Sequence, residues 1–281
     1  MMSHRPYPRL TSSMATLVLL LIAALFVAIG WFALPVFLHS SQTLLTFQWQ
    51  PELGCYGILP MVAGSALVAL MALMLACPLA LGLTAFGLLV RRPWLATLVR
   101  TVVRLMAGVP TVVYGIAALF LLVPLLRESF RAGSGYSLLA AALMLSLLIL
   151  PVMVSMLDSQ MRPLMLQLRI GARSMGFTDA QTLTYLVLPR CRRAMISAAL
   201  LGFGRAVGDT LLPMMLAGNA PQLTGSVLDS IRTLTAHIGL VVATEQGSAM
   251  YNSLFASGLI LLGLSAVLTL TTRALLKGGQ P

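Results

Sequence analysis

Apolar and polar stretches alternate along the whole chain. Six apolar runs stand out, at residues 15–38, 57–90, 105–126, 136–157, 194–217 and 250–270. A helix needs about 20 apolar residues to cross the hydrocarbon core of a bilayer, and lipid offers the backbone no hydrogen-bond partners outside the segment. The pattern therefore predicts an all-α polytopic membrane protein with six transmembrane helices.

The six runs also define the domain organisation. We expect a polar N-terminal segment over residues 1–14, one transmembrane domain over residues 15–270 and a polar tail over residues 271–281. The second run, residues 57–90, corresponds to about 51 Å of helix, which exceeds the hydrocarbon thickness. We therefore expect this helix to tilt, to bend at Pro78, or to leave the membrane.

The connection between the fifth and sixth runs covers residues 219–247. Four apolar residues in it share one helical face: Val227, Ile231, Leu234 and Ile238. This spacing predicts a short helix that lies on the membrane surface or packs on the bundle.

A polar island, residues 158–193, separates the fourth and fifth runs and carries six arginines. Pro163 suits the first turn of a helix, because its missing N–H is unpaired there in any case. Gly176 suits the C-terminus of that helix, since glycine adopts positive φ without a steric clash. The first half of the polar island is therefore predicted to be a short helix that ends in a turn.

A second short helix is predicted to follow the turn. Thr178 and Gln181 have the spacing of a capping box, in which each side chain binds the backbone of the other. Leu188-Pro189 then ends this helix, because proline removes a backbone donor and clashes with the preceding turn. The polar island as a whole therefore predicts a helix–turn–helix between two membrane spans.

Composition and charge support this topology. Hydrophobic residues make up 59% of the chain, charged residues 9%, and the net charge is +11. Of the 18 Lys and Arg residues, 14 fall on the side that holds both termini and the polar island, 3 fall on the other side, and Arg205 lies inside a span. Because basic residues prefer cytoplasmic loops, we expect both termini and the polar island in the cytoplasm, in a multi-pass protein of the cytoplasmic (inner) membrane. The basic balance then reflects topology and not nucleic-acid binding.

Several kinds of chemistry are excluded or unsupported. The three cysteines, Cys55, Cys77 and Cys191, fall in an exterior loop, a span and an interior loop, so we expect free thiols. The three histidines are scattered and have no metal-ligand spacing. A P-loop needs Gly-Lys before Ser or Thr, but the only lysine, Lys277, follows Leu276, so this motif does not support ATP hydrolysis by the chain.

The fifth run contains the polar residues that most suggest function. An arginine near the middle of a span costs about 2.5–3.5 kcal/mol on insertion scales, so Arg205 should face protein or water. Asp209 lies one helical turn away and is its expected partner. Two interpretations remain open: Arg205 contacts an anion on a polar path, or the Arg205–Asp209 pair only holds the bundle together. Gly204 and Gly208 have the Gly-x-x-x-Gly spacing that lets another helix approach closely.

The polar island carries a family resemblance. Gly176 is followed ten residues later by Leu186-Val187-Leu188-Pro189. This arrangement resembles the cytoplasmic loop of ABC importer permeases, where Glu-Ala-Ala precedes a glycine and an Ile-x-Leu-Pro ending. The opening differs, because Ile170-Gly171-Ala172 stands where Glu-Ala-Ala is expected and only Ala172 matches.

Two further regions narrow the resemblance, which covers roughly residues 57–275. The stretch from Gly108 to Gly115 is Gly-Val-Pro-Thr-Val-Val-Tyr-Gly, and the fifth run contains Gly-Arg-Ala-Val-Gly-Asp-Thr followed by Gly-Asn-Ala-Pro. These stretches are similar to conserved stretches of phosphate-specific ABC permeases, and most similar to the subunit type that carries Gly-Asn-Ala-Pro. Asp209 replaces the usual glutamate, which keeps the charge and shortens the side chain by one methylene.

The resemblance implies an ABC importer type I permease-like fold and a transporter subunit, not an enzyme. It implies a permease for inorganic phosphate that works with a second, related but different permease chain, two ATPase subunits and an extracytoplasmic phosphate-binding protein. ATP and Mg would bind the partner ATPases, and no cofactor is expected in this chain. Arg205 and Asp209 are the expected substrate-path residues, with Thr210 as a further hydroxyl donor. The expected ATPase-docking residues are Ala172, Arg173, Gly176, Thr178, Asp179, Leu188 and Pro189.

Two alternatives are kept. The first is a permease of the same superfamily for another oxyanion, such as sulfate, molybdate or a phosphonate. The second is an ATPase-independent anion carrier or channel that uses Arg205 and Asp209 as an ion or proton relay. The polar island disfavours the second alternative, because a self-sufficient carrier needs no ATPase-docking loop.

Overall fold

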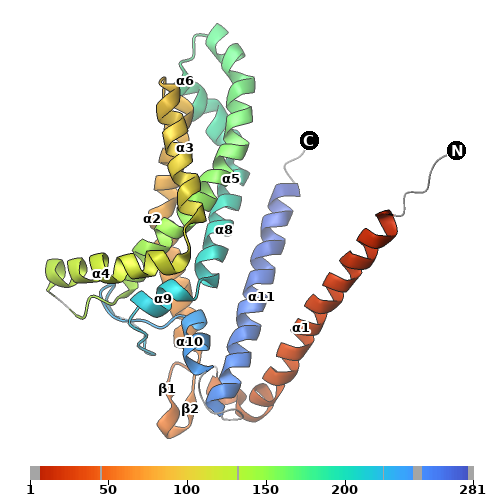
Figure 1. The fold of residues 1–281 in the computed structure, drawn as a ribbon, viewed down its shortest axis with the longest axis vertical. Coiled ribbons are helices and arrows are strands. Elements are labelled where there is room, and N and C mark those ends of the chain that lie inside the picture. The colour runs from red at the N-terminus through yellow and green to blue at the C-terminus, as the bar shows by residue number, and fades with distance from the viewer. Residues whose placement is uncertain (1–6, 45, 132, 224, 243–248, 278–281) are drawn as a thin grey trace.

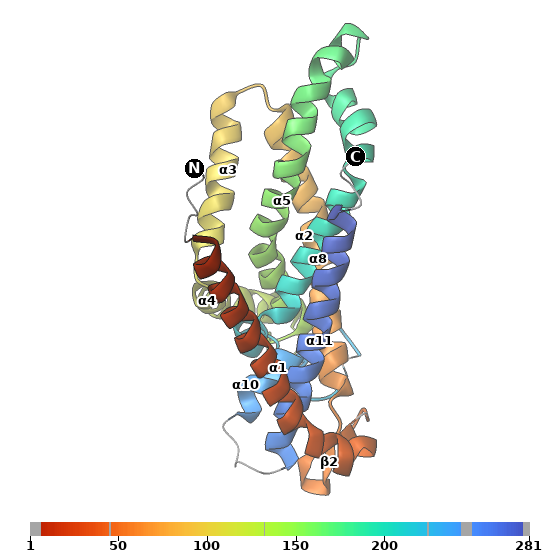
Figure 2. The same cartoon turned by 90° about the vertical axis from the view of Figure 1, so that its right-hand side faces the viewer.

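The structure, a computed structural model, describes residues 7–44, 46–131, 133–223, 225–242 and 249–277. Long helices run roughly along one axis and form an elongated bundle (Figures 1 and 2). These long helices are α1 (Tyr7–Leu44), α2 (Leu59–Leu89), α3 (Pro93–Gly108), α5 (Leu138–Ser174), α8 (Arg192–Gly208) and α11 (Ala249–Lys277).

The remaining elements connect these helices or cover them. Near one end of the bundle lies a small β-hairpin with two residues in each strand. It pairs β1 (Trp49–Gln50) with β2 (Cys55–Tyr56), and the 3-10 turn η1 (Pro51–Leu53) connects them. The other connecting helices are α4 (Thr111–Phe130), α6 (Asp179–Gln181), the π-helix η2 (Thr182–Val187), α7 (Leu188–Arg190), α9 (Leu211–Leu216) and α10 (Leu234–Val241).

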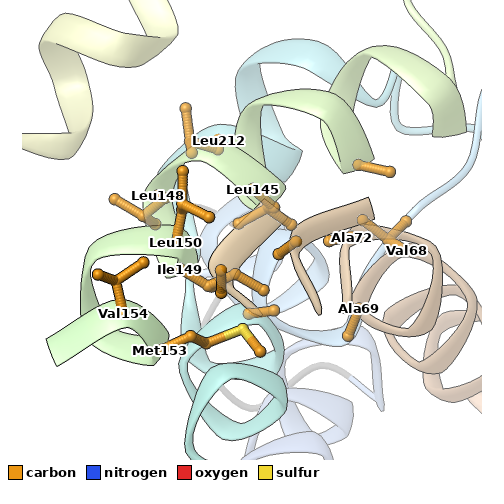
Figure 3. Close-up of a cluster of buried hydrophobic side chains, with 14 of the residues drawn as sticks. Val68, Ala69, Ala72, Leu145, Leu148, Ile149, Leu150, Met153, Val154 and Leu212 are labelled. Atoms are coloured by element: carbon orange, nitrogen blue, oxygen red, sulfur yellow. The ribbon is translucent and has the colours of Figure 1, made fainter. Parts of the chain in front are cut away.

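The main core lies where α2 and α5 pack together, with α8 and α9 against them. Small residues of α2, including Ala69 and Ala72, face larger residues of α5, including Leu145 and Ile149, and all four are almost fully buried (Figure 3). Gly202 of α8 completes the contact, because a Cβ there would lie 2.9 Å from the Met153 sulfur. Alternating small and large side chains let these helices approach closely without voids.

The predicted third span, residues 105–126, is not one helix. The chain turns a corner at Val109-Pro110, and α4 runs across the direction of α3 (Figure 1). Proline disfavours helical backbone in the residue before it, so Val109 is extended with ψ 128°. The Tyr114 hydroxyl donates to the Met106 carbonyl across the corner at 2.9 Å. Pro110 and Tyr114 therefore shape the chain at this point.

The predicted fifth span, residues 194–217, is also divided. Its first part ends with α8 at Gly208, and the short helix α9 begins at Leu211. Asp209 has extended backbone, with φ −76° and ψ 130°. Irregular backbone at membrane depth is tolerated where protein or a water-filled cavity surrounds it.

Five described helices are long and apolar enough to cross a membrane: α1, α2, α4, α5 and α11. Four of them correspond to predicted spans, and α4 is the second part of the divided third span. Helix α2 continues through Pro78 as one element. Helix α1 begins at Tyr7, inside the segment predicted to precede the membrane domain. Residues 1–6 and 278–281 of the predicted terminal segments lie outside the described residues.

The helix predicted in residues 219–247, with Val227, Ile231, Leu234 and Ile238 on one face, is shorter than expected. Only Leu234–Val241 of the described part forms a helix, α10. Ile231 instead bridges to Gly218 and is fully buried, whereas Val227 is exposed. Tertiary contacts therefore override the apolar period upstream of Leu234.

Candidate functional site

Arg205 lies in the last turn of α8, immediately before the helix breaks. Its side chain is exposed, and no ion pair to it within 4 Å occurs among the residues that the structure describes. The guanidinium therefore points out of this subunit with its donors available.

Asp209 has a different environment. It is 5% exposed, and its carboxylate accepts a hydrogen bond from the Leu212 N–H at 3.0 Å. This bond satisfies one of the unpaired donors at the start of α9. Thr210, the residue between the two helices, is half-buried and makes no side-chain cap bond to α9.

The expected Arg205–Asp209 pair is not formed. Because α8 ends at Gly208, Asp209 is not on the same helix, and its carboxylate turns toward α9. The three ion pairs of the described chain all lie in the polar island and none includes Arg205. The geometry therefore separates the roles: Asp209 caps α9, and Arg205 forms no ion pair within 4 Å among the described residues.

The predicted close contact at Gly204 and Gly208 is absent within the described residues. A Cβ at Gly204 would meet only Leu268, at 3.7 Å, and a Cβ at Gly208 would meet no described atom within 4 Å. The tight approach on α8 is instead at Gly202. The side of α8 that carries Gly208 and Arg205 is thus open in this subunit.

Side chains distant in sequence hold the α8–α9 break in place, and no periodic pattern predicts them. The Thr235 hydroxyl donates to the Asp209 carbonyl at 2.8 Å, and the Ser65 hydroxyl accepts from the Leu234 N–H at 2.7 Å. All these groups are buried. The available signal was Ser65, one of two hydroxyl residues in the apolar run 57–90.

The polar island projects from the bundle as a helical hairpin (Figure 1). The prediction of a separate first helix was wrong, because α5 continues without interruption from Leu138 to Ser174 and Pro163 lies inside it. Gly176 lies just past the C-terminus of α5, as predicted, with φ +85°. The Phe177 N–H binds the Ala172 carbonyl and the Gly176 N–H binds the Arg173 carbonyl, which together form a Schellman motif.

The turn of the polar island is held by a capping box and an ion cluster. The Thr178–Gln181 capping box is present in full. Asp179 binds Arg169 at 2.6 Å and Arg173 at 2.9 Å. Hydrogen bonds from Arg169 and then Arg173 lower the pKa of Asp179 to about 2, so this carboxylate is charged at any physiological pH.

The returning arm does not end at Leu188-Pro189. It widens into the π-helix η2, continues as α7 and reaches α8 through a turn at Cys191. The Leu188 N–H binds the Leu183 carbonyl, five residues back. A wider turn relieves the clash that Pro189 would cause in an α-helix, which explains why the helix continues.

The predicted ATPase-docking residues differ in how far a partner could reach them. Ala172 is 1% exposed and packs inside the hairpin, while Arg173, Gly176, Thr178 and Pro189 are exposed. Asp179 and Leu188 are half-buried.

The outer surface of the polar island also carries large apolar side chains. Ile170 is 81% exposed, and Leu166, Met175 and Tyr185 are exposed to a similar degree. Apolar side chains gathered on a polar projection are typical of a protein interface.

No group of three or more His, Cys, Asp or Glu residues suited to a metal occurs in the part of the chain that the structure describes. The three cysteines are free thiols.

The bundle, its two interrupted helices and its projecting polar hairpin define a helical membrane transport component. Residues 76–278 match the family described as binding-protein-dependent transport system inner membrane component. The chain belongs to this family and is the permease subunit of an ABC importer, a transporter component and not an enzyme.

Individual relatives agree with this assignment. The chain is 34% identical over 237 residues to the probable ABC transporter permease protein YqgH of Bacillus subtilis, covering 83% of this chain and 77% of the relative. It is 30% identical over 258 residues to the phosphate transport system permease protein PstC of Xylella fastidiosa, with coverage of 85% and 77%. PstC of Haemophilus influenzae is 25% identical, with coverage of 98% and 93%.

A solved structure supports the predicted type I permease fold. The structure described as the inward-facing MetNI methionine ABC transporter has a TM-score of 0.61 and 15% identity, and the match covers 81% of this chain and 99% of that chain.

Proposed function

We propose that this permease imports inorganic phosphate across the cytoplasmic membrane. The observation that carries the proposal is the unpaired Arg205 guanidinium beside the α8–α9 break, on a side of α8 that this subunit leaves open. A guanidinium presents several N–H donors in a planar fork that suits tetrahedral oxyanions. The PstC relatives add support, because their names state phosphate transport.

The permease is proposed to work in an assembly. A second permease chain completes the path, a binding protein delivers phosphate from outside, and two ATPases bind ATP and Mg in the cytoplasm. Figure 1 supports one orientation, since the start of α1 and the end of α11 point toward the end from which the polar island projects. The basic residues concentrated on that side support a cytoplasmic position for it.

The polar island is proposed to dock one ATPase. Its apolar surface around Ile170 gives a binding area, and the Arg169–Asp179–Arg173 cluster keeps its turn in shape. Single cysteines placed along residues 167–182 test the contact by cross-linking. Cross-links to the ATPase are expected from exposed positions such as Ile170, and the absence of any cross-link would refute the docking assignment.

Cellular uptake of radioactive phosphate tests whether Arg205 lies on the substrate path. Arg205→Ala is expected to abolish uptake while the protein still inserts, because the anion loses its charged contact. Arg273→Ala, on an exposed residue of α11, is the matched control and should transport normally. Normal uptake by Arg205→Ala would remove Arg205 from the path.

Two competing functions have their own measurements. Binding of phosphate, sulfate, molybdate and a phosphonate to the associated binding protein decides the oxyanion. Anion flux through the purified chain in liposomes without an ATPase would support the independent carrier.

A further inference from the structure

A second basic site lies away from Arg205, at the end of the bundle from which the polar island projects. A small cleft of about 70 Å³ opens between α2, α3 and α5. Its polar lining comes from Arg100 and Arg104 of α3, Ser155 and Asp158 of α5, and Thr84 of α2.

The two arginines face the cleft together. Arg100 and Arg104 are four residues apart on one helix, so their side chains share a face. Like charges at this spacing repel and destabilise the helix unless an anion lies between them. An anion bound between the two guanidinium groups would relieve this repulsion.

The nearby acid does not supply that counterion. Asp158 is bound through both carboxylate oxygens by Arg162, on the same helix. No ion pair within 4 Å joins Asp158 to Arg100 or Arg104 in the described structure. With Asp158 and Arg162 neutralising each other, the cleft keeps two formal positive charges.

Arg100 has an unsatisfied hydrogen-bond donor. Its Nε is buried and has no hydrogen-bond partner among the described residues. A buried donor without a partner costs about 1–3 kcal/mol, more for a charged group. The Thr84 hydroxyl already donates to the Ala80 carbonyl at 2.8 Å, whereas the exposed Ser155 lines the cleft directly.

We propose that this cleft binds a phosphate group through Arg100 and Arg104. The group comes either from free inorganic phosphate or from the headgroup of an anionic lipid, since both present the same oxyanion to the guanidinium fork. The site goes beyond the proposed import path and does not depend on it, because the cleft shares no residue with Arg205 and its surroundings.

Chemical protection of a cysteine tests the site. Ser155→Cys is introduced into the full chain after Cys55, Cys77 and Cys191 are replaced, and its rate of reaction with neutral N-ethylmaleimide is measured in dodecyl maltoside, which has no phosphate group. Inorganic phosphate at ten times its Kd should slow the reaction about tenfold relative to chloride at equal ionic strength. Protection by phosphatidylglycerol micelles alone would identify the lipid headgroup as the source.

Controls in the same chain make the outcome specific. Ser159→Cys, on the same helix outside the cleft, should show no protection. Arg100→Gln with Arg104→Gln should abolish it. Arg100→Lys with Arg104→Lys should fold normally, because both charges remain. It should bind phosphate more weakly, because the planar fork of donors is lost. Arg205→Gln should keep full protection, so loss of uptake and loss of this site are distinguishable.

Two results would overturn the proposal. One is the absence of protection by both phosphate and phosphatidylglycerol. The other is equal protection in the double Gln variant or at Ser159→Cys.

Discussion

The cap on α9 makes a quantitative prediction for Asp209. Replacing Asp209 by Ala removes the acceptor for the buried Leu212 N–H. Loss of a helix N-cap costs about 0.5–2 kcal/mol, and an orphaned buried donor costs a comparable amount. We therefore expect Asp209→Ala to lower the free energy of unfolding by about 1–2 kcal/mol, a factor of about 5–30 in the folded-to-unfolded ratio.

Asp209→Asn is the matched comparison. Its amide oxygen can accept the same hydrogen bond, while its charge is lost. Thermal unfolding of the two purified variants should show a lower Tm for Asp209→Ala and nearly the original Tm for Asp209→Asn, and phosphate uptake should fall further in Asp209→Ala. Equal destabilisation of both variants would refute the capping argument, because the charge and not the acceptor would then be the stabilising feature.

The charge-swap variant separates capping from pairing. Arg205→Asp with Asp209→Arg should not restore uptake, since no ion pair between these residues exists to be rebuilt. Restored uptake would show that pairing alone matters.

Three further results are expected. Burial, and secondarily the charge of Arg232, lowers the pKa of His237 to about 4. Because an unfolded histidine titrates near 6.5, this residue should leave the free energy of unfolding unaffected above pH 6.5 and lower it by roughly 3 kcal/mol as the pH drops from about 6.5 to 4. The Tm of His237→Gln should lose this pH dependence. Gly64→Ala should cost about 1–3 kcal/mol, because a Cβ there would lie 2.3 Å from the Arg232 carbonyl oxygen, whereas Gly82→Ala, with no described atom within 4 Å, should leave Tm unchanged or higher. Asp179→Ala should weaken cross-linking of the polar island to the ATPase, and unchanged cross-linking would show that the ion cluster is dispensable.

The sequence was informative where one local rule decided the structure. Glycine at Gly176 and the Thr178–Gln181 pair fixed the turn of the polar island, and both are present as predicted. The apolar runs located most of the membrane helices, because lipid imposes a length and a composition on them.

The breaks in the third and fifth spans were not predictable from hydropathy. Each break lies inside an apolar run that is long enough to form one helix, so hydropathy does not mark a change of direction. The α8–α9 break is stabilised by Thr235, far away in sequence, and Arg205 cannot be separated from Asp209 until the end of α8 is known. Proline did not show by itself whether a helix ends. Pro110 lies at a corner of the chain, whereas Pro78 and Pro163 lie within continuous helices.

The uninterrupted helix α5 has a mechanical consequence. Its 37 residues extend about 55 Å from the core to the turn of the polar island, with no joint between them. Its inner half is packed against α2, so force applied at the turn reaches the core as a tilt of one rod and not as the bending of a hinge. From Met153, which packs against Gly202, to Ser174 the helix extends about 32 Å, so by simple geometry a tilt of about 5° moves the far end by about 3 Å. The polar island and the membrane core thus form one lever, in which the tightly packed core beside Gly202 is the fulcrum.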